Sequence, residues 1–155
     1  MRLLRITWAV AGIALAILVL WLVALVLLRV TLDGEWLLRA GTLDGSPISR
    51  AANHPTTLGI DGGRFGGRAP CNEYNGYIDM SVGLLLDASR GSLHMHDTFR
   101  TLALCLDDSV MQSEADYLAA LARVSHFQRD GSRLILSGSG VELQFDLNTS
   151  LAPTP

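Results

Sequence analysis

The stretch Cys71-Asn72-Glu73-Tyr74-Asn75-Gly76-Tyr77 is the most informative part of this 155-residue chain. It follows a Gly-rich stretch at residues 62–67. Asn72, Asn75 and Gly76 tolerate positive φ and are typical of turns. The pattern therefore predicts a strand, a tight reversal and a second strand, with Cys71 at the end of an element.

A second stretch, Thr101-Leu102-Ala103-Leu104-Cys105, places another cysteine just before a change to helical periodicity. Ser109 with Gln112 three residues later forms a capping-box pattern, which predicts a helix start at Ser109. An apolar stripe continues to Val124 at helical spacing. We interpret Glu114 as a first-turn helix charge rather than a general base, because spacing places no carboxylate or nucleophile beside it.

These marks occur in an order that resembles the META domain family, which includes the bacterial heat-shock protein HslJ. The matching residues are Trp36, Cys71, Asn72, Gly76, Thr101, Cys105 and Glu114, followed by a terminal hairpin at residues 134–136 and 141–145. The resemblance spans residues 32–147. Leu102 stands where the family often has Arg, and no lipoprotein cysteine follows the leader. The resemblance implies a non-enzymatic envelope protein concerned with envelope maintenance or stress tolerance.

The periodicity after the leader predicts a β-rich α+β fold. Short alternating runs separated by Gly-rich turns indicate strands. The expected strands cover residues 35–40, 56–60, 64–68, 77–80, 84–87, 92–96, 127–129, 133–136 and 141–145. In the first strand, Trp36, Leu38 and Ala40 should share one face. We expect a curled antiparallel sheet covered by one amphipathic helix, together with one N-terminal transmembrane helix.

The leader, residues 1–30, is expected to be a membrane anchor. Between Ile6 and Leu28 there is no charged residue. These residues reach roughly 35 Å as a helix, enough to cross a hydrocarbon core about 30 Å thick. Arg2 and Arg5 precede the run, so the N-terminus is expected in the cytoplasm of a bacterium and the domain in the periplasm. A cleavable signal peptide is the alternative, although the run is long and lacks a convincing cleavage site.

An oxidising compartment favours a disulfide between Cys71 and Cys105. Their separation is unlike that of a Cys-x-x-Cys redox motif, and no further cysteine suggests a zinc site. A disulfide would stabilise the fold by roughly 3 to 4 kcal/mol on the loop-entropy model. Free thiols remain the alternative.

Composition predicts one extracytoplasmic domain, residues 31–148, with a disordered tail at residues 149–155. Outside the leader, nine arginines oppose 15 acidic residues, a net charge of −6. An acidic domain repels phosphate backbones, so nucleic acid is not expected as a partner. No cofactor is expected.

His94 and His96 are weak candidates for a metal site, because residues two apart on a strand share a face. A third ligand would have to come from elsewhere. The alternative is that both lie on the solvent face, opposite Leu93 and Met95. These histidines and the cysteines are the only residues of the sequence that suggest enzymatic chemistry. We do not expect an enzyme.

Gly12 and Ala16 are four residues apart and share a helix face, so a transmembrane protein partner could approach closely there, besides membrane lipid. A second functional class follows from this pair. In this alternative, the chain is a single-pass accessory subunit of a larger inner-membrane complex.

Overall fold

The computed structural model describes residues 15–21, 32–51, 53–82 and 89–149. Contacts divide the chain into two units, 1–31 and 32–155. In the first, residues 15–21 are helical, and the side chains from Leu15 to Trp21 are exposed. Among the described residues, no helix combines the length and apolar character needed to cross a membrane. Most of the predicted span between Ile6 and Leu28 lies outside the described residues, as do residues 150–155 of the predicted tail.

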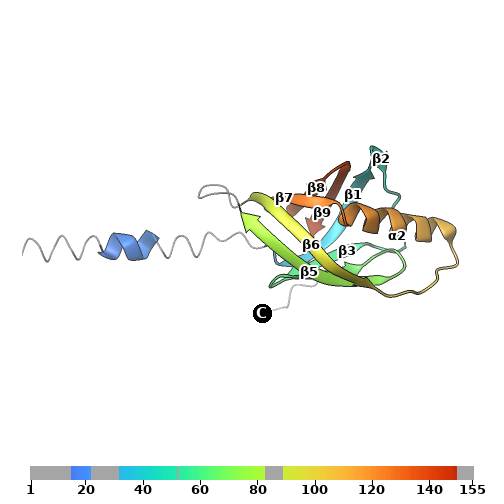
Figure 1. Ribbon diagram of the computed structural model, residues 1–155, viewed down its shortest axis with the longest axis horizontal. Helices are drawn as coiled ribbons and strands as arrows, with labels where there is room; N and C mark the ends of the chain where they lie inside the picture. The colour runs from blue at the N-terminus through green and yellow to red at the C-terminus, as the bar shows by residue number, and fades with distance from the viewer. Residues whose placement is uncertain (1–14, 22–31, 52, 83–88, 150–155) are drawn as a thin grey trace, which may run out of the picture. The chain divides into compact units, whose positions relative to one another are not determined.

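The second unit is an antiparallel β-barrel of eight strands (Figure 1). Its elements are β1 (Gly34–Leu43), β2 (Ser46–Pro47), β3 (Thr57–Asp61), β4 (Arg64–Arg68), β5 (Glu73–Val82), β6 (Arg90–Arg100), α2 (Asp108–Leu121), β7 (Val124–Asp130), β8 (Arg133–Gly138) and β9 (Val141–Leu147). Neighbours follow the order β1-β3-β4-β5-β6-β7-β8-β9, and β1 pairs with β9 to close the circle. The expected curled antiparallel sheet therefore closes into a barrel, with β2 as a short extension beside β1.

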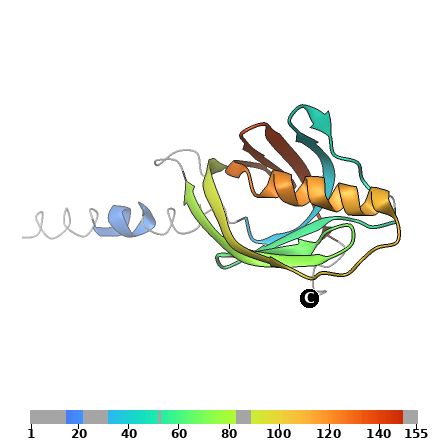
Figure 2. The ribbon, with the colours of Figure 1, turned by 45° about the vertical axis from the view of Figure 1, so that its right-hand side comes forward.

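The barrel opens between β6 and β7, and α2 fills that opening. Among the described residues, only Arg90, Gly91 and Ser92 of β6 pair with β7, and the rest of that edge of β6 pairs with no strand. The chain leaves β6 and returns along α2 before entering β7, as Figure 2 shows. Tyr117 and Leu121 of α2 are buried in the same core as the barrel strands. The helix thus covers apolar side chains that would otherwise be exposed where β6 and β7 do not pair.

The first strand departs from the predicted alternation. Trp36 and Leu38 are buried as expected, but Ala40 is exposed. A β-bulge between Leu38 and Ala40 in the pairing with β9 is the cause, because one extra residue reverses which side chains point inward. The strand also continues to Leu43, beyond the expected end at residue 40.

Two other local predictions were wrong at least in part. The expected strand, reversal and second strand are present, because β4 and β5 pair antiparallel with Arg68 opposite Glu73. Asn75 and Gly76 lie within β5, however, and none of Asn72, Asn75 and Gly76 has positive φ. Gly76 is required for a different reason: a Cβ there would lie 2.7 Å from the Phe65 ring and 2.8 Å from the His96 carbonyl oxygen. The helix is capped by Asp107, whose carboxylate accepts from the Ser109 N–H, and not by Ser109.

Two buried tyrosines connect α2 to strands of the barrel by hydrogen bonds. The Tyr74 hydroxyl lies 2.6 Å from the Tyr117 hydroxyl and donates to the Thr57 carbonyl at 2.7 Å. Because a carbonyl can only accept, the single Tyr74 proton goes to Thr57, and Tyr117 must donate to Tyr74. Burial raises the pKa of both phenols above the usual value, and proximity to Tyr117 raises the pKa of Tyr74 further.

This donor order predicts unequal effects of removing the two hydroxyls. Tyr74→Phe removes both the donor to the Thr57 carbonyl and the acceptor of the buried Tyr117 hydroxyl. Tyr117→Phe removes only the donor to one lone pair of the Tyr74 hydroxyl. We expect Tyr74→Phe to lower the free energy of unfolding by about 1 to 2 kcal/mol more than Tyr117→Phe. Urea unfolding of both variants measures the difference. An equal effect, or a larger effect for Tyr117→Phe, would contradict the assigned order.

Candidate functional site

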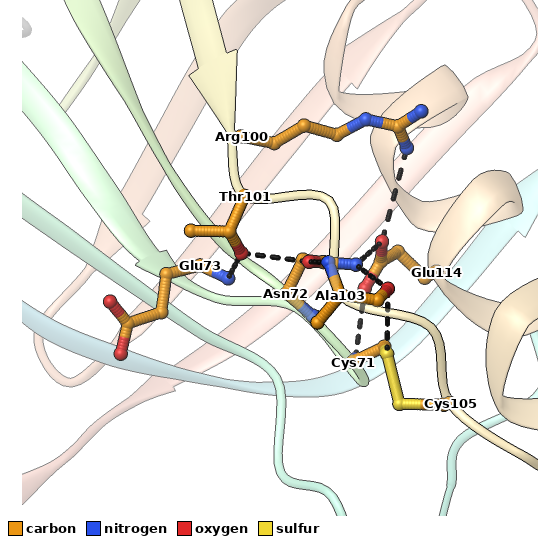
Figure 3. A network of polar contacts seen from close by, with 8 residues as sticks. All are labelled: Cys71, Asn72, Glu73, Arg100, Thr101, Ala103, Cys105 and Glu114. Carbon is orange, nitrogen blue, oxygen red and sulfur yellow. Dashed lines mark hydrogen bonds and ion pairs between the residues drawn. A yellow bond between two sulfur atoms is a disulfide. The ribbon is translucent and has the colours of Figure 1, made fainter.

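The polar residues singled out in the sequence meet in one network, where the loop before β5, the segment after β6 and α2 come together (Figure 3). The centre is Glu114, seven positions into α2 and 1% exposed. The expectation of a first-turn surface charge is therefore wrong. The carboxylate lies on the buried face of the helix and turns inward to two backbone N–H groups.

Every hydrogen-bond partner of the Glu114 carboxylate is a donor. Oε2 accepts from the backbone N–H groups of Cys71 at 2.9 Å and Asn72 at 2.7 Å. Oε1 accepts from the Asn72 side-chain amide at 2.8 Å, and an Arg100 guanidinium nitrogen lies 3.8 Å away. Three hydrogen bonds and a nearby cation compensate the desolvation of a buried charge.

Asn72 connects this carboxylate to the segment after β6. Its amide nitrogen also donates to the Ala103 carbonyl at 3.2 Å. Its amide oxygen accepts from the Thr101 hydroxyl and from the Ala103 N–H, each at 2.7 Å. Both donor hydrogens and both lone pairs of the side chain are thereby used. Asp has no amide hydrogens, and it would place a second carboxylate beside Glu114.

The disulfide closes the same junction covalently. Cys71 and Cys105 are bridged, with their Cα atoms 6.0 Å apart. Thr101 is held at the other end of the segment, since its N–H donates to the Glu73 carbonyl and its hydroxyl accepts from the Glu73 N–H. The predicted bridge is confirmed.

The network gathers Cys71, Asn72, Thr101, Cys105 and Glu114, all of which the sequence had singled out. Two predicted residues lie elsewhere: Trp36 is in the core, where its indole N–H donates to the Leu32 carbonyl, and Gly76 is in β5. Sequence reasoning missed Arg100, because an arginine at the end of a strand gives no distinctive signal. It also missed Ala103, which participates only through its backbone.

The histidine pair lies on β6, outside this network. The rings of His94 and His96 stack with their centroids 5.6 Å apart, and the side chain of Leu93, which precedes His94, is buried. The two ring nitrogens of His96 lie 3.3 Å from Asp79 and 3.2 Å from Asp97. In the part of the chain that the structure describes, no three His, Cys, Asp or Glu residues are arranged to hold a metal ion.

An open groove of about 680 Å³ crosses the outer face of β1, β3 and β4. Gly59 and Gly66 form part of its floor, and Glu35, Asp61 and Arg64 contribute charge of both signs. Among the described residues, no hydrogen bond places a pair of these groups for acid–base or nucleophilic chemistry.

The network predicts that Glu114→Gln destabilises the domain. The NH2 group of a glutamine would face either the two backbone N–H groups or the NH2 group of Asn72. In both orientations a donor faces a donor. We expect a loss of about 1 to 3 kcal/mol in the free energy of unfolding. Asp116→Asn is the matched control, because Asp116 is on the same helix and its bond to Gln112 is exposed. Chemical denaturation with the disulfide intact measures both, and similar values for the two variants would contradict a central role for Glu114.

Comparisons with known proteins agree with this architecture. The family model described as META domain matches residues 29–150. A Burkholderia xenovorans protein solved by NMR is 25% identical, with a TM-score of 0.59, covering 82% of this chain and 88% of that one. A second NMR structure is 14% identical, with a TM-score of 0.53 and coverage of 74% and 89%.

A crystal structure of a duf4847 family protein from Bacteroides vulgatus is likewise 14% identical, with a TM-score of 0.51 and coverage of 75% and 93%. The two likenesses at 14% identity concern the fold alone. Among curated proteins, none matches this chain. Because the family model matches most of the chain, and does so over the residues that build the barrel and its polar network, the chain belongs to the META domain family.

Proposed function

We propose that this chain is an HslJ-like META protein anchored in the bacterial inner membrane, with its barrel in the periplasm. It acts there by binding, without catalysis, in envelope maintenance or stress tolerance. The disulfide is the observation that carries the placement, because such bridges persist in oxidising compartments and are rare in the cytosol. The uncharged run between Ile6 and Leu28, preceded by two arginines, supports the same topology.

A binding role is supported by the way the polar residues are used. Glu114 and Asn72 are buried, and their side chains are engaged by neighbouring segments of the same domain. A buried carboxylate enclosed by structural donors has no free position for a substrate proton. In this proposal the exposed surface of the domain therefore binds the other molecule.

The second candidate is an accessory subunit of a larger membrane complex. The specific observation in its favour is the pair Gly12 and Ala16, which would let another transmembrane helix approach closely. Purification of the full chain in mild detergent separates the candidates. Co-migration with stoichiometric membrane proteins favours the subunit, and a free species favours the independent protein.

Placement is tested in intact cells and spheroplasts of a bacterium that expresses the full chain. We expect external protease to digest the barrel in spheroplasts, because the domain lies outside the cytoplasmic membrane. We also expect Cys71 and Cys105 to react with a maleimide only after reduction. A cytoplasmic protein serves as the lysis control. Protection of the barrel from protease, together with alkylation of both cysteines without reduction, would refute the placement.

A further inference from the structure

Three leucines project from the segment that the polar network holds in place. Along residues 101–106, alternate positions are anchored: Thr101 and Ala103 bond to Asn72, and Cys105 is in the disulfide. The positions between them are exposed, with fractional exposures of 81% for Leu102, 88% for Leu104 and 105% for Leu106. We call these three residues the leucine strip.

The size and pattern of the strip distinguish it from scattered surface residues. A single exposed leucine is ordinary on a protein surface. Three exposed leucines at alternate positions of one segment together present a few hundred Å² of apolar area. Exposed patches of roughly this size often serve binding. The fold gains almost nothing from side chains this exposed. Their apolar surface is available for contact with another molecule.

The segment that carries the strip resembles a strand with one free edge. The Asn72 amide donates to the Ala103 carbonyl and accepts from the Ala103 N–H, as a neighbouring strand would. Within the described residues, the backbone groups of Leu102 and Leu104 have no recorded hydrogen-bond partner. A free edge with alternating side chains can pair with a strand of another protein. The disulfide and the Asn72 bonds fix the segment beforehand, which lowers the entropy lost on binding.

The charge beside the strip disfavours a lipid bilayer as its partner. Thr101 bonds to Glu73, which pairs with Arg68, so the strip lies at the end of the barrel opposite Gly34, which pairs with Ile60. Asp107 and Asp108 follow Leu106 directly, and their charges repel anionic lipid headgroups.

A second copy of the chain is also disfavoured, on grounds of area. A stable interface buries about 800 Å² on each partner. Two strips facing each other would bury only a few hundred Å² on each chain. Apolar pockets in a different protein can enclose the same leucines on all sides, and they bury more surface for each residue.

From these observations we propose that the leucine strip is a preformed strand-like ligand for a partner protein. That protein has an open sheet edge, apolar pockets at alternate positions and basic residues that face Asp107 and Asp108. The inference rests on the proposed binding function and names the surface through which it operates. In this mode main-chain hydrogen bonds supply affinity, and the leucine pockets supply specificity.

The test uses the full chain in its own cells, with a photoreactive phenylalanine analogue placed singly at Leu102, Leu104 or Leu106. Met80 on β5, 39% exposed, is the control position. We expect each strip position to crosslink to the same protein, at alternate residues of one edge strand identified by mass spectrometry. Changing the two remaining strip leucines to Ser should reduce the adduct at least about tenfold. The Met80 position should not give this adduct.

Adducts with lipid, with a second copy or with a helix of the partner would overturn the proposal, as would the absence of a protein adduct at all three positions. The triple variant Leu102→Ser, Leu104→Ser, Leu106→Ser should keep its Tm within about 3 °C, because these side chains are exposed. Protease accessibility in the same cells reports placement separately. A periplasmic barrel without strip adducts refutes the strip alone, whereas a cytoplasmic barrel refutes the proposed function.

Discussion

The buried Glu114 carboxylate constrains the rest of this structure. An ionisable group that is 1% exposed requires compensating donors, and here they come from the backbone of Cys71 and Asn72 and from the Asn72 side chain. These donors belong to the loop before β5, whereas the carboxylate belongs to α2. Satisfying the charge therefore fixes the helix against the barrel at the place where β6 and β7 separate. A different helix position would leave a buried charge or buried N–H groups without partners.

The disulfide and the Asn72 amide act on the same junction by different physical means. The bridge limits the conformations of the unfolded chain, and the amide specifies the register of the segment 101–105 against β5. Their combined result is a rigid loop outside the barrel ladder. A segment held in this way keeps its side chains in a fixed arrangement before any partner binds.

Local patterns predicted the elements better than their arrangement. The strands expected at residues 56–60 and 64–68 correspond to β3 and β4, and the strand expected at residues 141–145 lies within β9. Such signals depend on residues close together in sequence. The exposure of Ala40 was not predictable, because the bulge arises from pairing with β9 about a hundred residues later. The expected strand at residues 84–87 lies outside the described residues.

The sequence alone was enough to predict the family, the disulfide, the helical and strand periodicities, and the acidic, single-domain character of the part after the leader. These properties depend on residue identity and short spacing. Only the tertiary structure decided that the sheet closes through β1 and β9, that Glu114 faces inward, and that Ala103 is held while Leu102 and Leu104 are exposed. The reason is physical: a backbone N–H or carbonyl has the same chemistry at every position, so its partner is chosen by the folded geometry.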